Sequence, residues 1–187
     1  MTLTIVLIAF LLLVAVWVIV GFNGLVRSRN MIREAWSGID VQLKRRHDLI
    51  PNLVETVKAY SSHEQKLFAD IAENRAKSMQ TQAVAAKGEY ENAISGQLRS
   101  IIAVAEAYPD LKAQANFLDL QKGLTEIEDQ IQYARRYYNA VVRDYNIKVE
   151  SFPSLIYAKA FGFKRVEFFE IALATEREAV TATFDQE

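Results

Sequence analysis

The chain opens with a long, uninterrupted apolar segment. Residues 3–22 carry no charged side chain, and only Thr4 and Gly21 fall outside the apolar residue types. At about 1.5 Å per residue, a helix of this length covers about 30 Å, the thickness of the hydrocarbon core of a bilayer. The pattern therefore predicts a transmembrane anchor over residues 1–22, in contact with the lipid bilayer through residues 3–22, and a separate domain over residues 23–187.

A cleaved signal peptide is the competing interpretation of this segment. Met1 and Thr2 provide no Lys or Arg before the apolar run, which is longer than that of a typical signal peptide, and no small-residue cleavage site follows it. These features favour an uncleaved anchor. Arg27, Arg29 and Arg33 follow the span, so the positive-inside rule predicts a single-pass protein with its N-terminus outside and its C-terminal part in the cytoplasm.

Beyond the anchor, apolar residues recur mostly at spacings of three and four, the period of an amphipathic helix. The clearest breaks are Tyr108-Pro109 and Phe152-Pro153, because proline pushes the preceding residue out of the helical region. A further break is open to two interpretations. Residues 61–64 have the form of a helix-capping box, whereas the small and polar residues 77–88 include a glycine that also suggests an interruption.

Placing that break near Ser61 gives three helices of about 38, 46 and 43 residues, matched in length as in an up-down-up bundle. We therefore predict an all-α fold, in which the transmembrane helix is followed by an antiparallel bundle of three long helices and a shorter C-terminal element. The C-terminal element is expected to pack back onto the bundle because it is rich in aromatic residues, namely Phe161, Phe163, Phe168, Phe169 and Phe184.

The composition excludes several classes of protein. Only 7 Gly and 3 Pro in 187 residues argue against a turn-rich β architecture. A net charge of -1 gives no bulk positive field for nucleic acid, so no nucleic-acid partner is expected. The chain has no Cys, which excludes disulfides, thiolate metal sites and a cysteine nucleophile.

Catalytic and ligand-binding signatures are weak. His63-Glu64 begins like the zinc-binding H-E-x-x-H motif, but Leu67 occupies the position of the second histidine. The acidic residues at 126, 128 and 129 lack the E-x-x-H partner of a di-iron bundle and are typical of a solvated helix face. No P-loop, dinucleotide-binding or hydrolase motif occurs. We expect no enzymatic activity, no metal or cofactor, and no small-molecule substrate.

A run of polar residues interrupts the apolar stripe of the first helix beyond the anchor. Lys44, Arg45, Arg46 and His47 are consecutive, so on a helix they fan through about 300° and at least one must face the apolar seam. Asp48 can pair with Lys44 at i,i+4 spacing. Arg46 or His47 then faces another helix of the bundle, and the candidate partners on the last long helix are Asp144 and Glu150.

Pro51 lies one turn after His47 and has no N–H to donate to the His47 carbonyl, so we expect a kink and a freed acceptor there. Two interpretations of the stretch remain. The favoured one is a polar layer that fixes the register of the first helix against the last long helix near Arg143 and Asp144. The alternative is a recognition surface for another protein or for phospholipid headgroups, made of Arg45, Arg46, His47 and Asn52. Tyr133 and Tyr137 are expected mainly to pack within the bundle, with a surface facing a partner as the alternative.

The chain resembles the LemA family of bacterial membrane proteins over essentially everything after the anchor. The resemblance rests on an ordered series of motifs: Ala35-Trp36-Ser37, Ile39-Asp40-Val41-Gln42-Leu43-Lys44-Arg45-Arg46, Asp48-Leu49-Ile50-Pro51-Asn52-Leu53-Val54, Ala107-Tyr108-Pro109-Asp110, Ala134-Arg135-Arg136, Arg143-Asp144-Tyr145-Asn146 and Phe161-Gly162-Phe163. It implies a single anchor in the bacterial cytoplasmic membrane, an antiparallel helical bundle and no assigned enzymatic activity.

The resemblance also implies partners. Relatives often accompany HtpX-like membrane metalloproteases, so such a protease is one expected partner and a homo-oligomer is another. The first functional hypothesis is accordingly a membrane-anchored scaffold or adaptor that acts through protein–protein interaction or oligomerisation. LemA-like proteins also occur in magnetosome membranes, which implies the alternative of a membrane-shaping or sensing module that contacts lipid headgroups.

Overall fold

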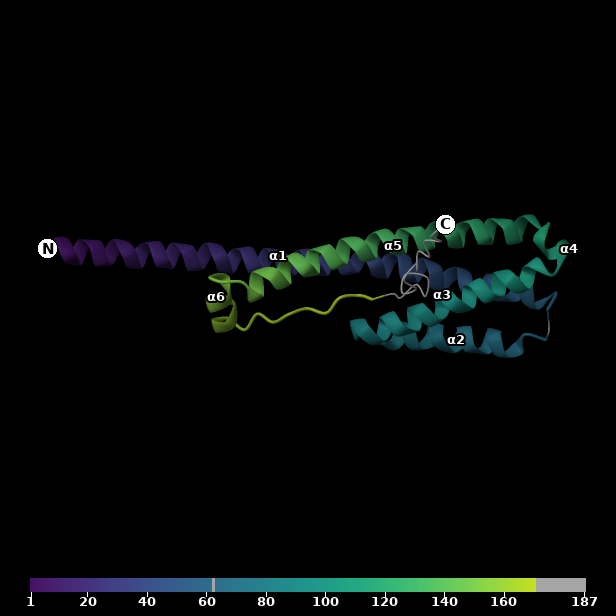
Figure 1. Cartoon of the computed structure of the whole chain (residues 1–187). Helices are drawn as coiled ribbons and strands as arrows, with labels where there is room; N and C mark the ends of the chain where they lie inside the picture. The colour runs from purple at the N-terminus through teal and green to yellow at the C-terminus, as the bar shows by residue number, and fades with distance from the viewer. Residues whose placement is uncertain (62, 171–187) are drawn as a thin grey trace, which may run out of the picture. The chain divides into compact units, whose positions relative to one another are not determined.

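The computed structural model describes residues 1–61 and 63–170, and within these ranges the secondary structure is entirely helical, with turns and one irregular C-terminal segment. The predicted all-α fold is confirmed. Six helices follow one another in these two ranges (Figure 1): α1 (Thr2–Lys58), α2 (Gln65–Gln80), α3 (Val84–Glu106), α4 (Pro109–Lys112), α5 (Ala115–Glu150) and α6 (Ser154–Ala160).

The breaks predicted at the two prolines are confirmed. Tyr108 precedes α4 in an extended conformation, with φ −119° and ψ 92°, and Pro109 is the first residue of that helix. Similarly, α5 ends at Glu150, and Pro153 directly precedes α6. α3 and α5 therefore each end two residues before the residue that proline restricts.

The prediction of three long helices was wrong in one respect: the expected middle helix is two helices. α2 and α3 are separated by Thr81 and Ala83, which adopt extended backbone angles, and the two helices pack side by side (Figure 1). Two shorter helices can turn their apolar stripes toward each other, which one continuous helix cannot do. Phe68 and Ile71 of α2 and Ile94 of α3 are thereby buried in one core.

The chain forms two compact units. The first comprises residues 1–45 and 127–168, and the second comprises residues 46–126 together with residues 169 and 170 of the described chain. α1 and α5 each contribute one part to each unit. The core of the second unit includes Ile50, Leu53, Val57, Phe68, Ile71, Ile94, Leu98, Ile101, Ala105, Leu111, Phe117 and Leu124.

In the first unit, the apolar stripe of α1 is buried with that of α5. Leu25, Ile32, Ile39 and Leu43 of α1 and Ile131, Tyr138, Val142 and Tyr145 of α5 are all at most 6% exposed. The rings of Trp36 and Tyr138 lie 5.4 Å apart between centroids. Nearer the apolar segment, Lys148 Nζ donates a 2.9 Å hydrogen bond to Ser28 Oγ.

The C-terminal element packs back, as predicted, within the described residues. After α6, residues 163–168 run along α5 (Figure 1). The side chain of Asn146 binds their backbone through two hydrogen bonds: its Nδ2 donates to the Val166 carbonyl and its Oδ1 accepts from the Val166 N–H, both at 2.9 Å. Phe169 is fully buried, whereas Phe161 is 54% exposed. Phe184 lies outside the described residues.

The N-terminal part of α1 has the features of a membrane span. Among the described residues, α1 alone is long and apolar enough to cross a bilayer. An 18-residue stretch of this helix has a mean hydropathy of 3.2, and none of that stretch is buried in the protein. An unbroken apolar helix that is not buried in the protein fits membrane association.

Candidate functional site

A buried polar network lies in the second unit, where α1, α2 and α3 meet. Its members are at most 9% exposed: Arg46 and His47 on α1, Ser78 on α2, and Glu91 and Ser95 on α3. Buried charges are rarely found without partners because their removal from water is costly. We therefore take these five side chains as the candidate site.

Glu91 is the centre of this network. Its Oε2 forms an ion pair with the guanidinium of Arg46, and its Oε1 accepts from His47 Nε2 at 2.9 Å and from the hydroxyl of Ser78. The Nη1 of Arg46 also donates to Ser95 Oγ at 2.8 Å. Both carboxylate oxygens are thus occupied by donors from two other helices.

The surroundings of Glu91 favour its ionised form. Burial by itself would raise the pKa of this carboxyl. The hydrogen bond from His47, the charges of Arg46 and His47, and the hydrogen bond from Ser78 outweigh burial and lower the pKa from its ordinary value of 4.5 to about 2. The carboxylate therefore acts as an acceptor at neutral pH and not as a proton donor.

A second contact joins α2 to α1 beside the network. The half-buried Arg75 donates from Nε to the carbonyl oxygen of His47 at 2.8 Å. This is the carbonyl that was predicted to be free because Pro51, which lies inside α1, has no N–H. A side chain of a neighbouring helix has taken the place of the missing backbone donor.

The predicted partners of the basic stretch were wrong. Asp144 lies beside Arg143 at 3.3 Å, with both side chains 64% exposed, and Glu150 lies 3.3 Å from Arg165. Arg46 pairs instead with Glu91. The break between α2 and α3 explains the error, since it gives the second unit a helix, α3, that supplies its own buried carboxylate.

The interpretation of the stretch as a recognition surface is wrong for its two central residues. Arg46 is 0% and His47 is 5% exposed, so neither can contact a partner or a headgroup. The remaining candidates of the stretch are exposed, namely Arg45, Asp48, Pro51 and Asn52. The polar layer exists, but it joins α1 to α2 and α3.

Glu91, Ser78, Ser95 and Arg75 were not singled out from the sequence. Glu91 had a detectable signal, because it lies three residues before the buried Ile94 and seven before Leu98, on the apolar stripe of α3. An acidic residue at a core position of one helix, together with a basic residue at a core position of another, predicts a buried ion pair. The spacing of the serines and of Arg75 carries no comparable signal.

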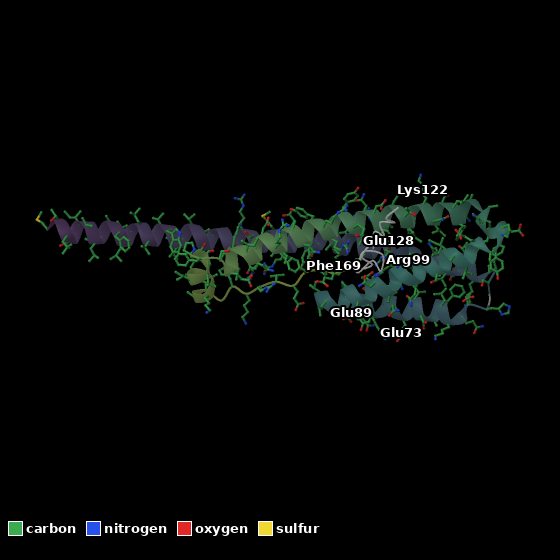
Figure 2. The ribbon with its side chains drawn as sticks, viewed as in Figure 1. Glu73, Glu89, Arg99, Lys122, Glu128 and Phe169 are labelled. Atoms are coloured by element: carbon green, nitrogen blue, oxygen red, sulfur yellow. The ribbon has the colours of Figure 1, made fainter. Side chains whose placement is uncertain are left out.

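The network is buried, and its hydrogen bonds and ion pairs join α1, α2 and α3. Within residues 1–61 and 63–170, no group of three or more His, Asp or Glu side chains is placed to hold a metal ion. By contrast, Glu73 and Glu89 lie on the outer sides of α2 and α3 (Figure 2). The acceptor oxygens of Glu91 are turned inward and used within the protein.

One exposed side of α5 in the first unit carries three large aromatic or apolar side chains. Tyr133, Tyr137 and Ile147 are 61%, 53% and 53% exposed, and at 100° per residue they fall within an arc of about 80° on the helix. The guanidinium of Arg136 lies 4.7 Å from the centroid of the Tyr133 ring. We call Tyr133, Arg136, Tyr137, Asp144 and Ile147 the outer face of α5. The expectation that Tyr133 and Tyr137 pack mainly within the bundle was wrong, since both are exposed.

Comparisons of the sequence with those of known proteins identify relatives of this chain. Magnetosome protein MamQ 2 of Paramagnetospirillum magneticum is 24% identical over 196 aligned residues, which cover 89% of this chain and 71% of that protein. Protein LemA of Metamycoplasma hominis is 28% identical over 153 residues, which cover 79% of this chain and 68% of that protein. The sequence model of the LemA family matches residues 35–184. Because this match extends over far more than half of the sequence, the chain belongs to the LemA family.

Proposed function

We propose that this protein is a membrane-anchored helical scaffold that presents the outer face of α5 to another protein. The observation that carries the proposal is the exposure of Tyr133, Tyr137 and Ile147 on one side of a long helix in the unit that also contains the anchor. Tyrosine and arginine are enriched in protein–protein interfaces, and exposed apolar patches mark interaction sites.

The charges beside this face favour a second copy of the chain as its first partner. Arg143 and Asp144 are adjacent and of opposite sign, so two copies related by a twofold axis can exchange them, with each arginine meeting the aspartate of the other copy. A membrane metalloprotease, the partner implied by the family resemblance, is the other occupant that the experiment below distinguishes.

The burial of Glu91 and its partners supports a scaffold over an enzyme. A catalytic carboxylate needs access to substrate and a pKa suited to proton transfer, whereas Glu91 is fully buried and its pKa is lowered to about 2. We propose that the protein has no enzymatic activity and that its work is done on its surface.

Site-specific photocrosslinking in intact membranes tests the scaffold. A benzophenone amino acid at Tyr137 of the full chain should give one dominant product, either of dimer mass or with a single other protein. The same probe at Glu73, which is 62% exposed on α2, should not give that product. The double variant Tyr133→Ala/Tyr137→Ala, with the probe at Ile147, should lose it. A diffuse smear of products, or identical products from both probe positions, would show that the outer face of α5 is not an interface.

We further propose that the anchor lies in the bacterial cytoplasmic membrane with its N-terminus outside, on the basis of Arg27, Arg29 and Arg33 beyond the span. Protease added to intact spheroplasts should then leave residues 23–187 undigested and digest them after lysis. Digestion before lysis would reverse the orientation.

A membrane-shaping or sensing module is the second candidate, and the relatives named as magnetosome proteins favour it. Its test is independent of crosslinking. Full-length protein reconstituted into large phospholipid vesicles should change vesicle diameter or curvature in electron micrographs in proportion to the protein added. Unchanged vesicles alongside a discrete crosslinked product would leave the scaffold as the function.

A further inference from the structure

α6 packs against the end of the apolar segment of α1, within the first unit. The ring of Tyr157 meets that of Trp17 edge-on, with centroids 5.2 Å apart and planes inclined by 75°. Phe22 makes similar contacts with Phe161 at 4.9 Å and with Phe163 at 5.7 Å. These ring contacts place α6 at the level of residues 17–22.

Gly21 allows this close approach. A Cβ atom built at Gly21 would lie 2.5 Å from Cζ of Tyr157 and 2.7 Å from its hydroxyl oxygen. The tyrosine ring therefore rests directly on the backbone of α1. A larger residue at position 21 would displace the Tyr157 ring from this contact.

The depth of this contact is informative. Trp17 lies five residues, or about 7.5 Å along a helix, inside the end of the apolar segment at Phe22. Amphipathic elements at a membrane surface bury their apolar face about 5–10 Å into the boundary between headgroups and acyl chains. Once residues 3–22 span a bilayer, as the proposed anchoring requires, Tyr157 lies at that depth.

α6 and the residues that flank it carry large apolar side chains that the described protein leaves largely uncovered. Phe152 is 81%, Ile156 59%, Phe161 54% and Leu155 38% exposed. Lys159 is the one charged residue in the segment 152–163, and it is also exposed. Large apolar side chains grouped in this way are costly in water but stable at a lipid surface, where a lysine can extend its ammonium toward the headgroups.

We propose that residues 152–163 form a second membrane-contact segment, which inserts Phe152, Ile156 and Phe161 into the leaflet in which the apolar part of α1 ends. The occupant of this apolar face is the boundary between phospholipid headgroups and acyl chains. The inference rests on the proposed anchoring of α1, and it adds a lipid-binding site that the anchor alone does not require.

The absence of cysteine from the chain makes a direct test possible, because each introduced cysteine is a unique labelling site. Spin labels are attached to the full-length variants Ile156→Cys, Leu12→Cys and Glu73→Cys, reconstituted in phosphatidylethanolamine–phosphatidylglycerol vesicles. Collision rates with oxygen, which concentrates in lipid, and with a water-soluble nickel chelate are then compared. Leu12 reports on the span, and the exposed Glu73 reports on water.

The label at residue 156 should show a several-fold higher ratio of oxygen to nickel collisions than the label at residue 73, at a depth shallower than residue 12. A ratio equal to that at residue 73, with residue 12 in lipid, would overturn the second contact and leave the anchor intact. Water accessibility at residue 12 would overturn the anchor and this inference together. If both reagents are excluded at residue 156 and the spectrum is broadened by a label on another molecule, the apolar face contacts a second copy of the chain. That result would also overturn the inference.

A second variant separates insertion from mere proximity. With the label at Leu155→Cys, the substitution Ile156→Asp should move the label toward water, because a carboxylate is costly to place among acyl chains. The matched substitution Leu118→Asp, at a position of α5 that is 47% exposed and lies outside the outer face, should leave the label unchanged. Equal readings for both substitutions would show that the segment does not enter the leaflet.

Discussion

The Nε–H of Arg75 donates a 2.8 Å hydrogen bond to the carbonyl oxygen of His47. In an uninterrupted helix, that oxygen accepts from the N–H four residues later, but residue 51 is a proline and has none. A side chain of α2 thus supplies the donor that α1 lacks. The missing backbone hydrogen bond at Pro51 leaves an acceptor through which α2 binds α1.

Replacing Arg75 by alanine should leave this carbonyl without its donor. We expect the free energy of unfolding to fall by about 1–3 kcal/mol, the cost of an unsatisfied, partly buried polar group. Equilibrium denaturation of the full chain in detergent micelles, followed by circular dichroism, measures the effect. Arg99, which is exposed on α3 (Figure 2), provides the matched control, and Arg99→Ala should change stability by less than about 0.5 kcal/mol.

The proline and the arginine should be coupled. Pro51→Ala restores a backbone N–H that can reach the His47 carbonyl, so Arg75→Ala should cost less in that background than in the natural sequence. A double-mutant cycle between the two positions should show an interaction energy of about 0.5–3 kcal/mol. Strict additivity of the two substitutions would contradict the role assigned to Arg75.

Loss of the central carboxylate should be more damaging. Glu91→Gln removes the charge that neutralises the fully buried Arg46, and breaking such a pair from one side costs about 3–5 kcal/mol. The exposed Glu89 lies two residues away on the same helix, so Glu89→Gln is a control of identical chemistry and should be nearly neutral. Similar midpoints of denaturation for the two variants would refute the structural role of Glu91.

Stability should also depend on pH through Glu91. Its pKa is about 2 in the folded chain, against an ordinary value of 4.5, so the unfolded chain binds this proton more readily. The stabilisation is therefore complete above about pH 4.5 and is lost as the pH falls from there toward about 2. At about 1.4 kcal/mol per pKa unit, its size is on the order of 3 kcal/mol.

The difference in unfolding free energy between the natural chain and Glu91→Gln, measured from pH 6 to pH 2, isolates this contribution from those of surface carboxylates. We expect the difference to shrink toward low pH, because the natural chain then also carries a neutral side chain at position 91. Curves that stay parallel over this range would contradict the depressed pKa.

Two glycines of α3 should respond oppositely to alanine. At Gly88, a Cβ atom would lie 2.9 Å from the carbonyl oxygen of Glu170, so Gly88→Ala must displace that backbone, and we expect a loss of about 1–3 kcal/mol. At Gly96 nothing lies within 4 Å, and Gly96→Ala should stabilise the helix by up to about 1 kcal/mol. Thermal unfolding of the two variants provides the measurement, and shifts of the same sign would contradict the close approach at Gly88.

The parts of the fold that were predictable from the sequence are those in which the chemistry of one residue sets the conformation of the backbone around it. Pro109 and Pro153 end helices through their own geometry, and the apolar stripe of α5 is regular enough to show which side is buried. His47 and Pro51 belong to the same class, since the freed carbonyl follows from the chemistry of proline alone. Each of these expectations depends on residues that are near one another in the chain.

The expectations that failed required knowledge of what lies across the core. Arg46 needed a buried partner, and Asp144, Glu150 and Glu91 were all acidic residues on helices. Only the turn at residues 81–83 determines that α3 supplies the partner. A match of helix lengths favoured one middle helix and so concealed that turn. Tertiary packing therefore decided between candidates that local spacing could not rank.

The unbroken course of α1 from Phe22 to Arg45 has a mechanical consequence. Each residue of a helix turns by about 100°, so the direction in which Trp17 faces is set by the direction in which Ile32 and Ile39 face in the first unit. Inserting one residue between them would turn the aromatic contact with α6 away by that angle. Because one continuous helix forms both the apolar segment and part of the helical packing of this unit, rotating the segment about its axis in a bilayer would also rotate Ile32 and Ile39 against α5.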